Sequence, residues 1–395
     1  MDFVDLKTQQ LRLKPKLESR IQAVLAHGQY IMGPEVFELE AQLADYAGVH
    51  QAIGCASGTD ALLLALMAFN LRPGEAIFTS PFTFVATAEV ISLLGAVPIF
   101  VDIDPRTFNM DPDKLELAIR ALNSNDASIH PLPKFFSPNS ELRTPGLIPK
   151  GIIPVDLFGV PADYDRINAI ARKHGLYVIE DAAQSFGAEY QGRKAGALSD
   201  IACTSFFPAK PLGAYGDGGM CFTRDEHLAE VMRSIRIHGQ GLDKYENVRI
   251  GINGRLDSLQ AAVLLAKFEI FPEEIEGRQQ VAASYNELLR PLSAGGALFL
   301  PQIPPGVKSA WAQYSVLARD SKARQDLIQK LKAASIPTAV YYPIPLHLQT
   351  AFSFLGYREG DFPVSEDCAG RIFSLPMHPY LKPEDQERIA KIFKE

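Results

Sequence analysis

The chain carries the stretch LYVIEDAAQSFG at residues 176–187, and this stretch indicates most directly how the chain folds. Its first five residues form a short, largely apolar run of the kind that suits a buried strand. Six comparable runs lie at 52–55, 76–79, 98–102, 152–156, 201–206 and 219–223. Longer stretches with helical spacing lie between them, at 60–69, 86–95, 163–174 and 225–238. Strands that alternate with helices predict an α/β fold built on a mostly parallel sheet of seven strands.

The length of the chain indicates more than one folding unit. At 395 residues the chain exceeds what one small core needs, so we expect two domains. The rhythm of strands and helices changes after a charged helical stretch at 268–290, which is suited to bridge them. We predict a large domain at 1–275, with an N-terminal arm, and a smaller C-terminal α/β domain at 276–395.

Residues 123–150 interrupt this rhythm. They carry five prolines and many serines and asparagines between a predicted helix and a predicted strand. This composition predicts a loop insertion. A loop of this length is either functional or a surface insertion without a role, because insertions at the surface are tolerated.

Composition and charge exclude several classes of protein. The formal net charge of -7 argues against a general nucleic-acid binder. No apolar run approaches the ~20 residues of a membrane helix, and the first residues do not form a signal peptide. The four cysteines and eight histidines form no metal-binding pattern, and the cysteine spacing suits free thiols in a reducing compartment. We therefore predict a cytoplasmic protein without a metal.

Asp181 follows the run at 176–180, so it lies at the carboxyl end of a predicted central strand. Open α/β sheets bind their ligands at this edge. A buried acid there either pairs with a cation or caps the helix that follows. Both interpretations stay open for Asp181 alone.

Lys210 lies in the stretch SFFPAKPLG at 205–213, among aromatic residues and prolines. Most lysines are solvated surface charges, but apolar surroundings favour a lowered pKa and Schiff-base chemistry. An amine that holds an aldehyde and a carboxylate that keeps a pyridine nitrogen protonated are the two groups that pyridoxal phosphate requires. Lys210 and Asp181 together therefore predict a pyridoxal-phosphate site with both residues in catalytic roles.

The triplet Ser57-Gly58-Thr59 stands between a predicted strand and a predicted helix. The N–H groups of a helix N-terminus and the Thr59 hydroxyl can bind a phosphate. A plain helix cap is the commoner explanation of such a triplet.

These segments resemble the DegT-like sugar aminotransferases, pyridoxal-phosphate enzymes with the aspartate-aminotransferase fold. The similar stretches cover nearly the whole chain and lie at 28–36, 57–62, 82–88, 101–104, 179–187, 205–213, 253–262 and 342–347. The resemblance implies an aspartate-aminotransferase-like large domain and a smaller C-terminal α/β domain.

The resemblance also implies a role for each site residue. Lys210 would hold the cofactor and carry a proton to and from the substrate carbon, and Asp181 would pair with the pyridinium nitrogen. The remaining cofactor-binding residues would be Gly58, Thr59 and Ser205 at the phosphate, Gln184 at the phenolic oxygen, Phe84 stacked on the ring, and Asn253 from a second subunit. A site shared in this way implies a homodimer.

For the reaction, the resemblance implies an amino donor, L-glutamate, and a keto nucleotide sugar as acceptor. The nearest likeness is to enzymes that aminate UDP-2-acetamido-3-keto-glucuronate for lipopolysaccharide and O-antigen sugars. Arg255 would pair with a uronate carboxylate or a diphosphate. Tyr341 stands where His usually precedes the Tyr-Pro of Tyr342 and Pro343, close to the sugar.

Three alternatives stay in view. The acceptor could be another 3-keto or 4-keto sugar nucleotide, such as UDP-3-keto-N-acetylglucosamine or a dTDP-keto-deoxyhexose. A sugar 3-dehydratase has His in place of the Schiff-base lysine, so Lys210 argues against it. A non-catalytic regulatory relative would be expected to lose some of the site residues, and this chain keeps them.

Overall fold

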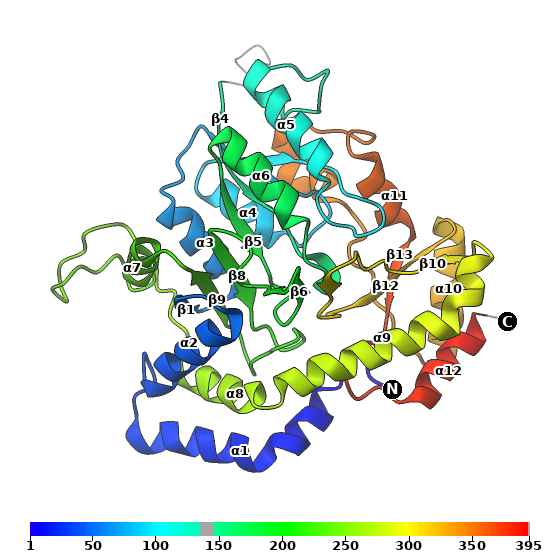
Figure 1. Cartoon of the computed structure of the whole chain (residues 1–395), viewed down its shortest axis with the longest axis horizontal. Helices are drawn as coiled ribbons and strands as arrows, with labels where there is room; N and C mark the ends of the chain where they lie inside the picture. The colour runs from blue at the N-terminus through cyan, green and yellow to red at the C-terminus, as the bar shows by residue number, and fades with distance from the viewer. Residues whose placement is uncertain (135–145, 394–395) are drawn as a thin grey trace.

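The computed structural model describes residues 1–134 and 146–393 and has a seven-stranded sheet at its centre (Figure 1). The strands lie in the order β1 (Gln51–Cys55), β9 (Gly219–Thr223), β8 (Ile201–Ser205), β5 (Tyr177–Asp181), β4 (Ile148–Ile153), β2 (Glu75–Thr79) and β3 (Val97–Phe100). Strand β9 pairs antiparallel with β1 and β8, and the other pairs are parallel. The predicted mostly parallel sheet is confirmed.

Helices cover both faces of this sheet because side chains along each strand alternate between the faces. Ile77, Ile153 and Ile179 pack in one buried cluster with α3 (Gly58–Ala68) and α7 (Glu226–Ile235). Phe78 and Val178 pack on the other face with α5 (Pro112–Ser124) and α6 (Tyr164–His174). The helices α2 (Pro34–Ala47) and α8 (Ser258–Phe268) cover the rest of that second face, and α4 (Ala86–Leu93) contributes to both clusters.

The chain begins outside this layer, with a short segment followed by α1 (Leu6–His27). Asp5 caps the helix by accepting hydrogen bonds from the Thr8 N–H at 2.9 Å and the Thr8 hydroxyl at 2.6 Å. Leu13 and Leu17 then pack against α8.

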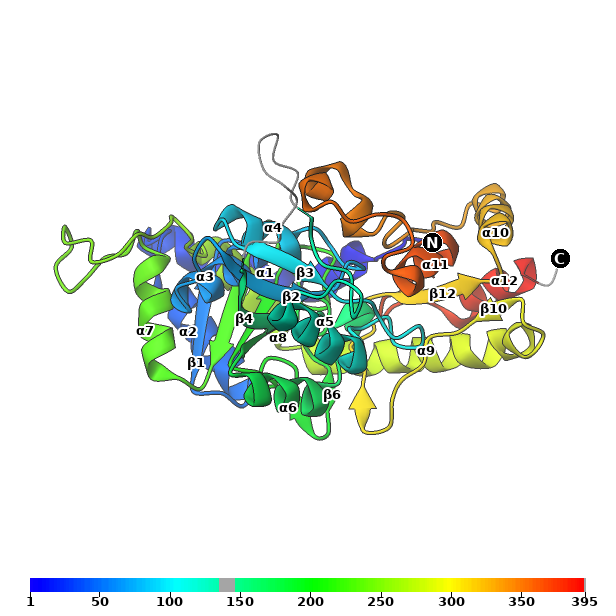
Figure 2. The ribbon, with the colours of Figure 1, turned by 90° about the horizontal axis from the view of Figure 1, so that it is seen from above.

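Helix α9 (Phe271–Ala294) connects the large sheet to a second group of elements at one end of the molecule (Figure 2). Phe271 and Ile275 pack beneath the large sheet, whereas Tyr285 and Leu289 pack against a three-stranded antiparallel sheet. That sheet consists of β10 (Leu298–Phe299), β12 (Tyr314–Ala318) and β13 (Ile372–Leu375), and α10 (Ser321–Ala333), α11 (Pro363–Arg371) and α12 (Pro383–Ile392) accompany it. This change of partner along α9 supports a domain boundary near residue 275, which stays our proposal.

The remaining elements are short. A third sheet joins β11 (Val307–Lys308) to β6 (Glu189–Tyr190) and β7 (Arg193–Lys194). Residues 346–362 leave the C-terminal group and return to the large sheet, where Leu346, Phe352 and Leu355 join its core. They include the short 3-10 helices η2 (Leu346–Leu348) and η3 (Thr350–Leu355). A further 3-10 turn, η1 (Leu157–Gly159), follows β4.

The predicted loop at 123–150 is wrong at both ends, since α5 continues to Ser124 and β4 begins at Ile148. Residues 135–145 of it lie outside the described part of the chain. Ahead of them, His130 Nε2 lies 2.8 Å from the Phe100 carbonyl oxygen, and the Lys134 N–H donates to the Leu355 carbonyl at 2.7 Å. The described beginning of this segment is therefore held on the core.

Two predicted strands end too late along the chain. The run at 152–156 extends past β4, because Pro154 has no N–H to continue the ladder. The run at 98–102 extends past β3, because the Asp102 carbonyl accepts a hydrogen bond from the Asp111 N–H at 3.1 Å instead of one from a neighbouring strand. Among the residues described, no helix is long and apolar enough to cross a membrane.

Candidate active site

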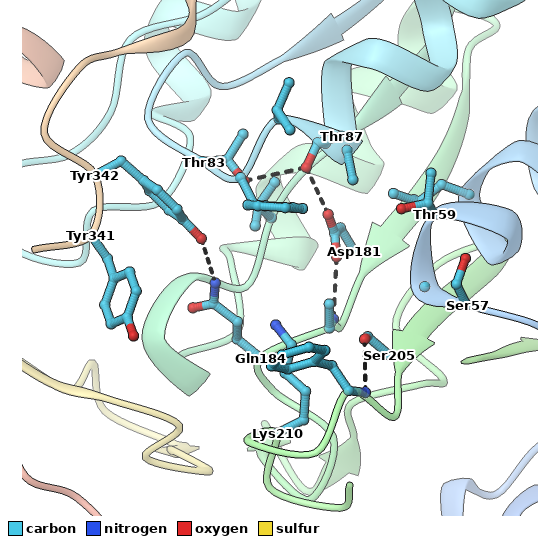
Figure 3. A pocket seen from close by; sticks show the side chains of 18 of the residues that line it. Ser57, Thr59, Thr83, Thr87, Asp181, Gln184, Ser205, Lys210, Tyr341 and Tyr342 are labelled. Atoms are coloured by element: carbon cyan, nitrogen blue, oxygen red, sulfur yellow. Dashed lines mark hydrogen bonds between the residues drawn. The ribbon is translucent and has the colours of Figure 1, made fainter. Parts of the chain in front are cut away.

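A cavity of about 780 Å³ opens at the carboxyl edge of the large sheet, where β5 ends at Asp181 and β8 ends at Ser205 (Figure 3). It brings together predicted residues from five distant parts of the sequence. They are Gly58, Thr59, Phe84, Asp181, Gln184, Ser205, Lys210, Tyr341 and Tyr342. Two predicted residues, Asn253 and Arg255, do not line it.

Asp181 lies at the back of the cavity and is 6% exposed. Its Oδ2 accepts a hydrogen bond from the Thr87 hydroxyl at 2.8 Å, and its Oδ1 accepts one from the Ala183 N–H at 3.2 Å. Burial raises the pKa of Asp181, while the charge of Lys210 acts in the opposite direction. A turn, not a helix, follows Asp181, so the helix-cap interpretation is wrong.

Lys210 lies in the loop between β8 and β9 and faces the same cavity. The backbone N–H of Lys210 donates to the Phe207 carbonyl at 2.9 Å. The Ala214 N–H donates to the Phe206 carbonyl at 2.7 Å, which closes the loop. Burial lowers the pKa of Lys210, and Asp181 opposes that shift. Within the described residues the Lys210 Nζ makes no hydrogen bond and no ion pair, which suits an amine that reacts with an aldehyde.

The N-terminus of α3 forms the opposite end of the cavity. Ser57 caps the helix, because its Oγ accepts the Asp60 N–H at 3.0 Å. A Cβ at position 58 would lie 2.6 Å from the Cβ of Ser205, so glycine allows the helix start to approach β8. Both interpretations of the triplet therefore agree with the structure: Ser57 caps α3, and Gly58 and Thr59 face the cavity where a phosphate can bind.

Gln184 and Tyr342 form a polar pair on a third side. The Phe158 N–H donates to Gln184 Oε1 at 2.7 Å, and Gln184 Nε2 donates to the Tyr342 hydroxyl at 3.1 Å. These bonds turn the amide nitrogen toward the cavity (Figure 3). Burial raises the pKa of Tyr342, so its hydroxyl keeps its proton.

The ring of Phe84 lines the cavity while 55% exposed. Its centroid lies 6.4 Å from that of Tyr342. An uncovered phenyl ring at this place can stack on a flat heteroaromatic ring.

Thr83 and Thr87 are site residues that the sequence analysis missed. Both are buried, their hydroxyl oxygens lie 3.2 Å apart, and Thr87 supports Asp181 directly. Their spacing of four residues in an otherwise apolar segment was the available signal. Gln313 and Gln349, which also line the cavity, gave no such signal.

Asn253 and Arg255 lie outside the cavity of their own chain. Arg255 Nε and Nη2 donate to Asn253 Oδ1 at 3.0 and 2.7 Å. Their backbone runs beside the end of β1, where Cys55 pairs with Arg255. The described residues contain no group of ligands that could hold a metal ion.

An unpaired lysine amine, a buried carboxylate and a helix N-terminus around one cavity are the groups that pyridoxal phosphate requires. Comparison with known proteins agrees, because residues 12–394 match the DegT/DnrJ/EryC1/StrS aminotransferase family. The chain belongs to this family, and it is an aminotransferase whose cofactor is pyridoxal phosphate.

The chain is 50% identical over 381 residues to the UDP-2-acetamido-2-deoxy-3-oxo-D-glucuronate aminotransferase of Pseudomonas aeruginosa. The matched region covers 96% of each protein. It is 42% identical over 396 residues to a pleiotropic regulatory protein of Geobacillus stearothermophilus, covering 99% of this chain and 98% of the relative. Its fold is similar to the crystal structure of a DegT DnrJ EryC1 StrS aminotransferase from Brucella abortus. That comparison has a TM-score of 0.91 and 47% identity and covers 100% of this chain and 98% of the other.

Proposed function

We propose that the chain transfers an amino group from L-glutamate to the keto group of a nucleotide sugar. The acceptor that fits best is UDP-2-acetamido-3-keto-2-deoxy-glucuronate, which would give the 3-amino sugar. One observation carries the proposal: Lys210 and Asp181 share a cavity in a chain that is 50% identical to an enzyme named for this sugar.

The cofactor would lie between Asp181 and the N-terminus of α3. Asp181 would bind the protonated ring nitrogen, whose positive charge offsets the cost of burying the carboxylate. Gly58, Thr59 and Ser205 would bind the phosphate, Gln184 Nε2 would donate to the phenolic oxygen, and Phe84 would cover one face of the ring. When bound, pyridoxal phosphate supplies an electron sink for the carbon that loses its proton.

Lys210 would supply two functions in sequence. Its lowered pKa leaves more of the amine neutral near pH 7, so it can hold the cofactor aldehyde. Once the substrate amine replaces it, the released Lys210 can move a proton to and from the substrate carbon. One site and one lysine serve both halves of the reaction, so ping-pong kinetics are expected.

The acceptor sugar would lie on the side of the cavity away from α3. Tyr341 and Tyr342 lie on that side (Figure 3), and Gln313 and Gln349 also line the cavity, so hydroxyl and amide groups are available to a sugar. Arg255 of a second chain would pair with the uronate carboxylate or the diphosphate.

A homodimer would complete the site. The segment between α7 and α8 projects from the body of the molecule in both views (Figures 1 and 2). It carries the exposed apolar side chains of Leu242, Tyr245 and Ile250 and leads to Asn253. Exposed apolar groups of this kind favour an interface, and the position of Asn253 outside its own cavity supports its use by a partner.

A cytoplasmic reaction that feeds lipopolysaccharide or O-antigen sugars fits this proposal. The four cysteines are free and buried, as suits a reducing compartment. A purely regulatory function is opposed by the assembled set of Lys210, Asp181, Gln184 and Ser205.

The test is isotope transfer. Purified protein is incubated with ¹⁵N-labelled L-glutamate and a panel of keto nucleotide sugars, and the products are identified by mass and by the position of the labelled amine. The proposal predicts a labelled 3-amino sugar from the UDP-linked 3-keto-glucuronate. Label in a different sugar of the panel would correct the acceptor, and no label in any sugar would overturn the proposed function.

A further inference from the structure

The first residues of the chain lie against the sugar side of the cavity, beside residues that are distant from them in the sequence. The Met377 N–H donates to the Phe3 carbonyl at 3.2 Å. Asp5 caps α1, and α1 packs on α8. Residues 1–5 are therefore held at one end by the C-terminal elements, through Met377, and at the other end by the large domain, through α1.

The two tyrosines of the sugar side are held in different ways. Tyr342 is fixed by its hydrogen bond to Gln184 and by ring contacts with Phe82 and Phe84. The Tyr341 hydroxyl makes no hydrogen bond to the other side chains drawn in Figure 3. The Tyr341 ring instead lies 5.9 Å from the ring of Tyr342 and 6.4 Å from the ring of Phe3, measured between centroids.

Both centroid distances lie within the range over which aromatic rings attract each other. Phe3 is thus a second ring in contact with Tyr341, in addition to Tyr342. The Phe3 carbonyl accepts the hydrogen bond from Met377, and this bond fixes the position of the Phe3 backbone and therefore of its ring.

We propose that Phe3 is a positioning residue for the acceptor sugar: it holds the Tyr341 ring at the sugar side of the cavity. Phe3 does not line the cavity, so it acts through Tyr341. This inference rests on the proposed function, because it assigns the Tyr341 side to the sugar. Both halves of the reaction share Lys210 and Asp181, but glutamate is much smaller than a nucleotide sugar and would not reach the Tyr341 side, so its half does not need Phe3.

The test compares Phe3→Ala with two matched variants. Val4→Ala removes an apolar side chain from the same segment and leaves both rings in place, and Phe3→Tyr keeps the ring. Each half-reaction is followed separately by absorbance, with L-glutamate in one and the UDP-linked 3-keto-glucuronate in the other.

Phe3→Ala is expected to raise the sugar concentration for half-maximal rate by about threefold to tenfold, as loss of an aromatic pair would. The glutamate half-reaction should stay within about twofold of the wild type, and Val4→Ala and Phe3→Tyr should behave as the wild type in both halves. Should Phe3→Ala fail to fold, Phe3→Leu keeps the bulk without the ring and takes its place.

An unchanged sugar half-reaction in Phe3→Ala would overturn the inference, and so would an equal loss in both halves, since that reports a general structural role. These outcomes differ from failure of the proposed function, in which the wild type itself would not react with the sugar.

Discussion

Burial determines the direction in which the pKa values of Lys210 and Asp181 are shifted. Burial lowers the pKa of Lys210 and raises that of Asp181, so both groups are pushed toward their neutral forms until a cofactor is bound. A positive ring nitrogen beside Asp181 would restore its charge, and the hydrogen bond from Thr87 acts in the same direction. Both residues could be predicted from sequence because each follows a strand-like run. The support from Thr87 was missed, because the four-residue spacing of Thr83 and Thr87 does not show which strand end their hydroxyls face.

Lys210→Ala should abolish transamination while the protein stays folded, because no other residue described in the cavity offers a free amine. We expect turnover to fall by about four orders of magnitude. Initial rates with glutamate and sugar measure this, and thermal unfolding shows whether the fold is kept. Lys322→Ala, an exposed lysine on α10, is the control. Substantial turnover in Lys210→Ala would remove Lys210 from its role.

Asp181→Asn should weaken catalysis far more than folding. The amide keeps the shape and removes a buried charge, but it cannot neutralise a protonated ring nitrogen. We expect kcat to fall by roughly 100-fold or more, with little change in the unfolding temperature. Steady-state kinetics and calorimetry of the same samples test this. An unchanged kcat would contradict the assignment.

At the scale of elements, the loop that carries Lys210 is anchored to helix α8. Lys267 on α8 is only 1% exposed, donates to the Gly213 carbonyl at 2.7 Å, and lies 4.2 Å from the Tyr215 ring centroid. The Tyr215 N–H donates to Gln260 Oε1 at 2.8 Å. This support could not be predicted from the sequence, because a lysine in a helix is usually at the surface.

Burial lowers the pKa of Lys267 to about 8, which makes its effect on stability depend on pH. Between that value and the usual lysine pKa of about 10.4, the unfolded chain binds more protons than the folded one, so stability rises with pH. Relative to Lys267→Met, the wild type should gain on the order of 3 kcal/mol in unfolding free energy from pH 8 to about 10.4. Urea unfolding of both proteins across this range measures the difference. Parallel curves would contradict it.

The close approach of α3 to β8 leads to a prediction about stability. Gly58→Ala places a Cβ 2.6 Å from that of Ser205, so we expect it to cost about 1–3 kcal/mol of stability. Adding Ser205→Gly should recover most of that loss, because the clashing atom is gone. Gly370→Ala, where a Cβ meets nothing within 4 Å, is the control. Unfolding free energies of the cofactor-free proteins decide this, and a double variant as unstable as Gly58→Ala would contradict it.

At the scale of the whole molecule, the alternation of strands and helices was enough to predict the large sheet. The return of residues 346–362 to that sheet was not predictable, because Leu346, Phe352 and Leu355 find their partners only in the tertiary structure. The same holds for Phe3 against Tyr341. Segments with local periodicity can be predicted from sequence, whereas contacts between distant irregular segments cannot.

If two chains share each site, two different inactive variants can restore activity to each other in a mixed dimer. If Asn253 and Arg255 serve the partner's cavity, a Lys210→Ala chain and an Asn253→Ala, Arg255→Ala chain should complement each other. Random mixing in co-expressed protein leaves half the dimers mixed, each with one intact site, so about a quarter of wild-type activity should return. The two variants mixed as separate, non-exchanging dimers are the control. No recovery in the co-expressed protein would contradict sharing of the site.

The central claim is that Lys210 holds pyridoxal phosphate and that L-glutamate, after displacing Lys210, leaves its amino group on this cofactor. An absorbance scan of the purified protein, before and after addition of L-glutamate without sugar, tests this most directly. We predict that the band of the lysine-bound cofactor is lost and that the shorter-wavelength band of pyridoxamine phosphate appears. A lysine-bound band that does not respond to glutamate would contradict the proposed donor. No band at all, even after pyridoxal phosphate is added, would contradict the assignment of Lys210.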